Sequence, residues 1–142
     1  MSLKQRKYEL NQVMKIEVNC KIFKIRIVES PSEQIEFSWS DSVMRTLEIK
    51  ENNGTISVVD HASIGIYGTL ALINLKKDAQ LLIKLPKAYS GKVTLQTREE
   101  IVHVTDVNFQ GNLGVSTSTG KILLENVAAR LIDIRANVGK TN

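Results

Sequence analysis

A repeat of nineteen to twenty residues in the last third of the chain constrains its fold more than any other feature. Three pentads share an apolar-polar-apolar-polar-small pattern, at residues 93–97 (VTLQT), 113–117 (LGVST) and 132–136 (IDIRA). The first two are each followed by a second short apolar alternation, at 102–104 and 122–124. A fixed period of this length is typical of stacked structural units, each of which buries its apolar face against its neighbours.

The repeat also predicts which side chains stack on one another. We expect three columns: Val93, Leu113 and Ile132 inside the core; Leu95, Val115 and Ile134 beside them; and Thr97, Thr117 and Ala136 at a narrower corner. Gly120 and Gly139 follow the second and third pentads by three residues, where they are expected to relieve a tight turn. Glu100 takes this place after the first pentad, so the first copy is expected to turn differently.

Period-two alternation dominates the rest of the chain and predicts half-buried strands. It occurs at residues 13–18, 22–27, 34–39, 70–75 and 81–85. A further pair of alternating segments flanks Asn53-Gly54, and this dipeptide predicts a tight hairpin because both residues tolerate a positive φ. No segment has a convincing helical period. The sequence therefore predicts an all-β chain.

Length and composition indicate a single globular domain of 142 residues, with 42% hydrophobic and 24% charged residues. The net charge of +4 is spread along the chain and lacks the dense basic stripe with aromatics of a nucleic-acid reader, so we expect no nucleic-acid partner. No stretch approaches the ~20 apolar residues of a transmembrane helix, and no signal peptide is visible. Because the chain stops within the third copy of the repeat, we expect it to be a fragment of a longer protein.

Few residues suggest chemistry. Cys20 is the only cysteine, so it cannot form an intrachain disulfide, and we expect a small buried residue rather than a nucleophile. His103 alternates with two valines and should point outward from a strand. Asp106 and Asn126 fall in register at a corner of the repeat, where they could form a calcium-binding turn or cap their own backbone. Capping is favoured because the glycine-rich calcium repeat is absent, and we expect neither a metal nor a cofactor.

Carboxylates would be needed if this chain were a polysaccharide-active enzyme. The candidates are Asp106, Glu125 and Asp133, but their spacing brings no pair to one cleft. We therefore expect a protein without catalytic activity.

Two surfaces are candidates for binding. The last repeat exposes a strand edge at Ile132, Ile134 and Ala136, which should pair with another chain, with a second copy of this one or with following residues. Thr97, Ser116 and Ser118 belong to a hydroxyl-rich segment that could form a polar face for a polymer or a protein. Such a face is also what the solvent side of any stacked repeat looks like.

Two segments resemble the bacterial "putative adhesin" family of β-solenoid domains. They are the strand-proline step at 81–87 (LLIKLPK) and the Thr-x-x-Gly-x-Ile pattern at 117–122 (TSTGKI), and the similarity is clearest over residues 80–142. The resemblance implies association with the cell envelope or surface and, for some members, with envelope-stress responses in Gram-positive bacteria. It implies no binding residues.

The predicted fold is all-β: a single-stranded, right-handed β-helix-like solenoid with irregular antiparallel N-terminal strands. We expect one domain over residues 1–142, irregular in 1–80 and coiled in 81–142. The expected function is non-catalytic binding or scaffolding at the bacterial cell envelope, with an unknown protein or envelope polymer as the partner. The alternative is a regulatory protein-interaction domain of an envelope-stress protein.

Overall fold

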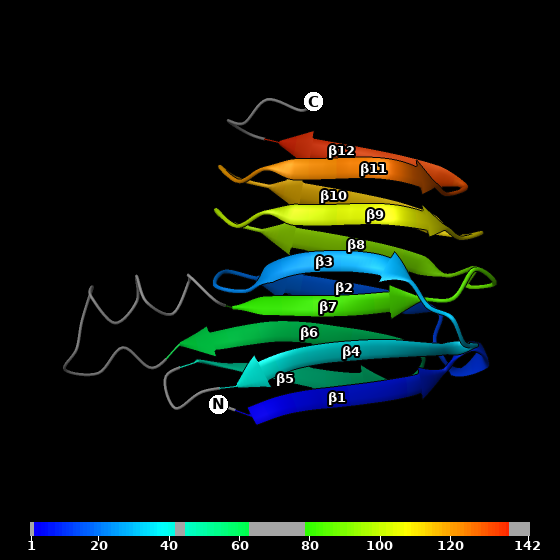
Figure 1. Ribbon diagram of the computed structural model, residues 1–142, viewed down its shortest axis with the longest axis horizontal. Helices are drawn as coiled ribbons and strands as arrows, with labels where there is room; N and C mark the ends of the chain where they lie inside the picture. Colours follow the sequence, from blue (N-terminus) through cyan, green and yellow to red (C-terminus); the bar gives the residue numbers. More distant parts are fainter. Residues whose placement is uncertain (1, 42–44, 63–78, 137–142) are drawn as a thin grey trace.

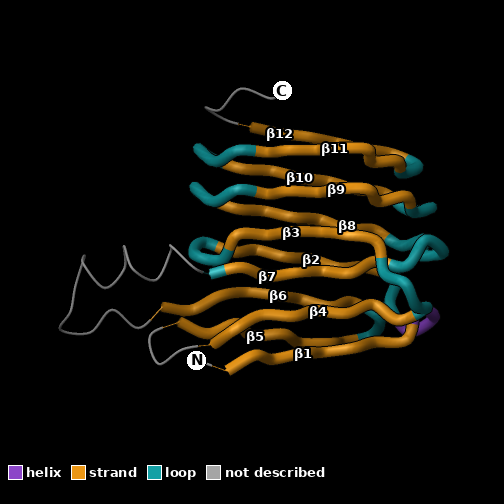
Figure 2. The backbone as a smooth tube through the Cα atoms, viewed as in Figure 1, coloured by secondary structure: helices purple, strands orange, loops and turns teal. Residues whose placement is uncertain are grey.

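The computed structural model describes residues 2–41, 45–62 and 79–136, and places them in two facing six-stranded sheets (Figure 1). Sheet A has the strand order β1-β4-β7-β3-β9-β11, and sheet B has the order β12-β10-β8-β2-β6-β5. In this part of the chain the one helix is a 3-10 turn, η1 (Leu10–Gln12), at the end of β1 (Figure 2). The prediction of an all-β fold is confirmed.

The strands follow the alternation of apolar residues, because successive side chains on a strand point to opposite faces. Sheet A contains β1 (Ser2–Glu9), β3 (Lys24–Glu29), β4 (Gln34–Asp41), β7 (Gln80–Leu85), β9 (Val102–Asn108) and β11 (Ile122–Ala128). Sheet B contains β2 (Lys15–Cys20), β5 (Arg45–Asn52), β6 (Thr55–Ala62), β8 (Lys92–Thr97), β10 (Asn112–Thr117) and β12 (Leu131–Ala136). The predicted strand at 70–75 and the predicted corner at Gly139 lie outside the described residues.

From β8 onward the chain alternates between the sheets, so that each repeat contributes one strand to sheet B and the next to sheet A (Figure 1). Strand β10 pairs in parallel with β8 on one side and with β12 on the other. Register places Leu113 between Val93 and Ile132, and Val115 between Leu95 and Ile134. The predicted columns of the repeat are therefore confirmed as pairings.

An earlier coil of the same kind lies in the middle of the stack. Strand β2 pairs in parallel with β6 and β8, and β3 pairs in parallel with β7 and β9. Ile16 and Val18 of β2 extend the columns, since they pair with Val93 and Leu95 of β8. This coil lies within the stretch predicted to be irregular, so the first half of the chain supplies part of the regular stack.

The expected antiparallel strands are also present. Strand β1 pairs with β4, β4 with β7 and β5 with β6, all antiparallel, so both sheets are mixed. The sequence pattern missed β1, because its residues are mostly polar and exposed; it pairs along its whole length with β4, whose Ile35, Phe37 and Trp39 face the core as expected. The hand of the predicted solenoid remains a prediction.

The hairpin between β5 and β6 turns at Asn53-Gly54, as predicted. Asn53 has a φ of 51° and Gly54 a φ of 85°, and the strands leave the turn with Asn52 opposite Thr55. Positive φ at both central residues gives the turn a twist that matches the flanking strands. The carbonyl of Gly54 accepts hydrogen bonds from the N–H groups of Met14 and Lys15, which ties the hairpin to the start of β2.

The threonines of the narrow corner column also form hydrogen bonds that hold the turn after each strand. Thr97 and Thr117 are buried, and the Thr97 hydroxyl donates to the Glu100 carbonyl over 3.1 Å. The Thr117 hydroxyl accepts from the Gly120 N–H over 2.8 Å. A Cβ added to Gly120 would collide with the Glu100 carbonyl, so glycine lets the second copy turn directly over the first.

The opposite corner also depends on close approach of the backbone. The Asn112 N–H donates to the Gly91 carbonyl, and the Arg130 N–H donates to the Gly111 carbonyl. A Cβ at Gly111 would overlap the carbonyl oxygen of Gly91. The two glycines therefore let successive copies stack at this corner, a requirement that the sequence pattern did not reveal.

Candidate functional site

Strand β12 is the edge of sheet B, and among the described residues it pairs on one side only, with β10. The predicted edge residues lie on this strand. Ile132 is 37% exposed and Ile134 is half-buried against the core, while Ala136 pairs in register with Thr117. The expectation that Ile132 is buried inside the core is wrong, because β12 is the edge strand and no described strand lies beyond it to cover this side chain.

Half-covered apolar side chains from β11 and the following turn lie beside this strand. Leu124 and Val127 pair with the buried Val104 and Val107 of β9, yet they are only partly buried because β11 is the edge of sheet A. We define the terminal apolar surface by its five residues: Leu124, Val127, Ala129, Ile132 and Ile134. A strand edge with no second partner among the described residues, beside partly exposed apolar side chains, is the kind of surface on which another polypeptide docks.

The three residues of the predicted polar face lie close together, with the Ser118 N–H donating to the Thr97 carbonyl, but their side chains do not share one face. Ser116 points outward from sheet B, in register with Gln96 of β8 and Arg135 of β12. Ser118 is exposed, but it lies in the corner turn after β10. Thr97 is 3% exposed and faces the core, so its placement on the polar face is wrong. The pentad pattern places Thr97 on the same side of the strand as Val93 and Leu95, and this position indicated the inward orientation correctly.

The carboxylates of the enzyme alternative each have a different partner. Asp106 accepts a hydrogen bond from the Asn126 amide over 2.9 Å. Glu125 lies 3.1 Å from Nε2 of His103, and Asp133 lies 3.3 Å from the Arg135 guanidinium. Asp133 is in sheet B, whereas the other two are in sheet A. The absence of catalysis remains a prediction.

Asp106 and Asn126 have positive φ angles of 52° and 55° and interrupt their strands at equivalent points. Glu125 pairs with Thr105 and Val127 with Val107, so the two residues form matched interruptions of neighbouring strands. The hydrogen bond joins the two side chains to each other, and the capping of their own backbone stays a prediction. No group of three or more His, Cys, Asp or Glu side chains suited to a metal ion occurs among the described residues.

His103 and Cys20 occupy the places expected from alternation. His103 lies on the outer face of sheet A and is partly exposed, with Nε2 2.9 Å from the Thr105 hydroxyl. It also lines a groove of about 200 Å³, together with Lys24, Ile25, Arg26, Gln80, Ile101 and Leu123. Cys20 is buried beside Thr97, and burial, followed by the charge of Asp60, raises the pKa of its thiol above the ordinary value. The thiol is therefore neutral and sheltered.

A larger cleft was not foreseen from the sequence. It has a volume of about 420 Å³ and is lined by Glu9, Leu10, Asn11, Val13, Glu33, Ala88, Tyr89 and Ser90. Three separate chain segments form it: the end of β1 with η1, the turn before β4, and the loop before β8. No local pattern could have indicated this cleft, because only the fold brings these segments together.

Tyr89 fixes the inner wall of the cleft. Its side chain is buried, its hydroxyl donates to the Lys92 carbonyl over 3.3 Å, and its ring lies 6.1 Å from that of Phe109. Burial raises the pKa of the Tyr89 phenol, so this group stays neutral at physiological pH. At the rim, Oε1 of Glu9 accepts a hydrogen bond from the Gln34 amide over 2.7 Å.

No helix among the described residues is long and apolar enough to cross a membrane. Two solved structures are similar to this chain at low sequence identity. A crystal structure described as "a putative cell adhesion protein" from Clostridium sporogenes ATCC 15579 is 11% identical with a TM-score of 0.43, covering 95% of this chain and 99% of that one. A "putative adhesin" from Bacteroides fragilis NCTC 9343 is 13% identical with a TM-score of 0.41. The similarity covers 95% of this chain and 76% of that one.

No protein with a curated description matches the chain. A family model does, and its match runs over residues 13–142, from the residues before β2 to the last residue of the sequence. The matched region takes in both the repeat and the earlier coil that β2 and β3 add to the stack. The chain therefore belongs to the Toastrack DUF4097 family.

Proposed function

We propose that this chain is a non-catalytic, adhesin-like binding domain of the bacterial cell envelope that captures a partner at the β12 edge. The observation that carries the proposal is that β12 pairs on one side only within the described part of the chain, beside the terminal apolar surface. The envelope location comes from the resemblance to adhesin-like domains. The proposal includes the right-handed course of the solenoid, although the place of β12 at the edge of sheet B follows from the strand order alone.

Binding at this edge would use both backbone and side chains. A partner segment that adds a strand to sheet B would form hydrogen bonds with the backbone groups on the side of β12 that no described strand pairs with. Apolar residues at alternate positions of that segment would cover Ile132 and Ile134, whose side chains share the inner face of the strand. The favoured partner is therefore an extended polypeptide segment with an alternating apolar face, presented by an envelope protein.

The second candidate is a regulatory protein-interaction domain of an envelope-stress protein. The same edge supports this role, since strand addition is equally suited to a reversible regulatory contact. The two candidates differ in where the partner resides. An adhesin-like domain should bind a component fixed in the envelope, whereas a regulatory domain should bind a protein that can be released from it.

The edge can be tested with two substitutions at neighbouring residues of β12. Ile132→Lys places a charge on the inner face of the strand, whereas Leu131→Lys places the same charge at a residue that is already 60% exposed. We expect Ile132→Lys to weaken binding to isolated envelopes of the source bacterium about tenfold or more, as measured by co-sedimentation, and Leu131→Lys to retain it. Circular dichroism melts would confirm that both variants fold.

Two results would contradict the proposal. One is that the unmodified domain does not sediment with envelopes, and the other is that both lysine variants bind as well as the parent. Partner recovery only from the soluble fraction, with the same sensitivity to Ile132→Lys, would replace the adhesin-like role by the regulatory one.

A further inference from the structure

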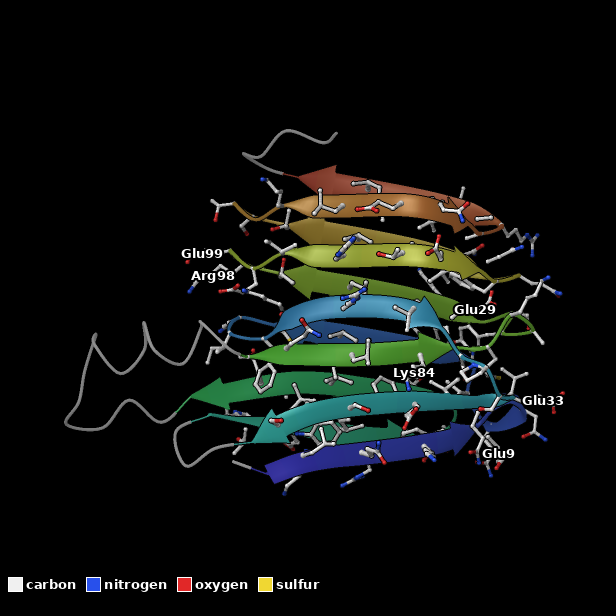
Figure 3. The ribbon with its side chains drawn as sticks, in the orientation of Figure 1. Glu9, Glu29, Glu33, Lys84, Arg98 and Glu99 are labelled. Atoms are coloured by element: carbon white, nitrogen blue, oxygen red, sulfur yellow. The ribbon has the colours of Figure 1, made fainter. Side chains whose placement is uncertain are left out.

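The cleft between η1, the turn before β4 and the loop before β8 is distinct from the β12 edge. Figure 2 shows η1 at one end of the paired sheets, and Figure 3 shows Glu9 and Glu33 at that same end. Its volume of about 420 Å³ lies within the range of small-ligand pockets in proteins. The cleft therefore has the size of a binding site, and none of its residues belongs to the terminal apolar surface.

The lining mixes apolar and polar groups, and polar atoms form the larger share of its accessible surface. Leu10, Val13, Ala88 and Tyr89 form the apolar part, and Asn11 and Ser90 add amide and hydroxyl groups. The Tyr89 hydroxyl donates to the Lys92 carbonyl, and its almost fully buried ring forms the base of the cleft. The apolar part of the lining can hold a short hydrocarbon stem, and the polar part can hold a charged head group.

The charged groups of the cleft are both carboxylates. The carboxylate of Glu9 accepts a hydrogen bond from the neutral amide of Gln34, and no lysine or arginine of the described residues lies within 4.0 Å of the carboxylate of Glu9 or Glu33. The cleft is thus locally negative in a chain whose net charge is +4. A cation that enters it would gain electrostatic stabilisation that the protein does not supply from within.

We propose that this cleft binds a ligand that presents a protonated amine on an apolar stem. The ammonium group lies between the carboxylates of Glu9 and Glu33, and the stem packs along Leu10, Val13 and Tyr89. Either a free alkylamine or the lysine side chain of a polypeptide has this chemistry. The proposal is independent of the β12 edge, since it uses different residues at a different place in the fold.

The charge requirement is tested by comparing n-butylammonium with n-butanol, which has a similar stem and no charge. We expect isothermal titration calorimetry to detect binding of n-butylammonium at low salt and at least about fivefold weaker binding of n-butanol. Glu33→Gln and Glu9→Gln should each weaken n-butylammonium binding about fivefold. Glu29→Gln is the matched control, because Glu29 is an exposed carboxylate at the same end of the molecule that does not line the cleft (Figure 3).

Several results would overturn the proposal: undetectable binding of n-butylammonium, equal binding of n-butanol, or an equal loss of binding in Glu29→Gln and Glu33→Gln. The last result would indicate general attraction to negative surface charge. Thermal melts that match the parent would show that the variants remain folded.

The two sources of the amine are separated with the peptide acetyl-Gly-Lys-Gly-amide and its Nε-acetylated form. Binding of the first peptide more tightly than n-butylammonium, with loss on Nε-acetylation, supports the site and assigns it to a protein lysine. Weaker binding of the peptide than of n-butylammonium, still dependent on Glu33, supports the site and assigns it to a free amine. Equal binding of the acetylated and unmodified peptides would contradict the proposal.

Discussion

Asp60 holds a corner of the central coil through its side chain. Its carboxylate accepts hydrogen bonds of 2.6 to 3.0 Å from the backbone N–H groups of Lys21, Ile22 and Phe23, which form the turn between β2 and β3. Successive N–H groups that converge in this way form a concave site for an anion. Here the anion is part of the protein, so β6 is joined to the coil stacked on it.

Replacing Asp60 by alanine should therefore destabilise the folded protein. We expect Asp60→Ala to lower the free energy of unfolding by about 2–3 kcal/mol, because two partly buried N–H groups and one exposed N–H group lose a charged acceptor. Urea denaturation would measure the change. His61→Ala is the matched control: its contact with Glu48 is exposed to solvent, so its loss should change stability much less than the loss of the Asp60 carboxylate. Equal stability of Asp60→Ala and the parent would show that water replaces the carboxylate.

The Cys20 thiol should respond to alkaline pH. Its pKa is raised mainly by burial, so the folded state disfavours the thiolate that the unfolded chain forms readily. This contribution to stability is complete below the ordinary thiol pKa of 9.0 and is lost progressively as the pH rises above it. We expect the unfolding free energy to fall more steeply between about pH 9 and 10.5 in the parent than in Cys20→Ala.

Thiol labelling gives an independent check on Cys20. A thiol-specific reagent at pH 8 should react slowly with the folded protein and rapidly in denaturant, because only the thiolate reacts and the native side chain is inaccessible. Fast labelling of the folded protein would contradict this prediction.

At the scale of the element, the corners between strands determine how closely copies of the repeat can stack. Gly91 and Gly111 lie at one corner and Gly120 at the other, and in each case a side chain would collide with backbone or with a buried group. Gly114 differs, since the one atom near an added Cβ is the Val93 carbonyl oxygen, 4.0 Å away. Identical residues in the same repeat thus have different roles.

This contrast predicts opposite outcomes for two glycine substitutions. Gly111→Ala should destabilise the protein by about 3 kcal/mol, because the added Cβ forces the stacked turns apart. Gly114→Ala should leave stability within about 1 kcal/mol of the parent, since alanine fits the strand and restricts the unfolded chain. Chemical denaturation of both variants would measure the difference. Similar stabilities would mean that the corner can open at little cost.

The strand elements show where local pattern is enough to predict structure. The columns through Leu113 and Val115 followed from spacing alone, because a parallel coil places residues one period apart beside each other. The hairpin at Asn53-Gly54 followed from two residues. The same reasoning missed β1, whose polar residues carry no burial signal, and misplaced Thr97, whose hydroxyl is compatible with either face. Local chemistry cannot distinguish a hydroxyl that faces solvent from one that bonds to a buried carbonyl.

At the scale of the whole molecule, stability should decline from the centre of the stack to its β12 end. Central strands such as β2 and β8 are paired on both sides and carry fully buried residues, whereas β12 is paired on one side. We expect native-state hydrogen exchange to show free energies of opening near the global value in β2 and β8, and lower by about 2 kcal/mol or more in β12. Measurements at several protein concentrations would reveal whether association covers the edge. Uniform protection along the stack would contradict a gradient.

The candidate sites were less predictable than the fold, because a site can depend on how distant segments of the chain come together. The β12 strand could be anticipated, because its pentad at 132–136 is visible in the sequence. The cleft could not, because Glu9, Glu33 and Tyr89 come from three segments that meet only once β1, β4 and β8 have taken their places. The position of the β2–β3 coil between later strands was equally hidden, since nothing in residues 15–29 specifies a partner near residue 92.

That central coil sets the order in which the molecule can be completed during synthesis. The ribosome delivers β2 early, yet one of its two neighbours, β8, follows only after β3 to β7 have been made. Until β8 is made, one edge of β2 is unpaired in the nascent chain, and Ile16 and Val18 lack the neighbours that they have in the folded protein. The interval between β2 and β8 is therefore when this protein is most exposed to mispairing, and a chaperone that shields β2 would act before the repeat exists.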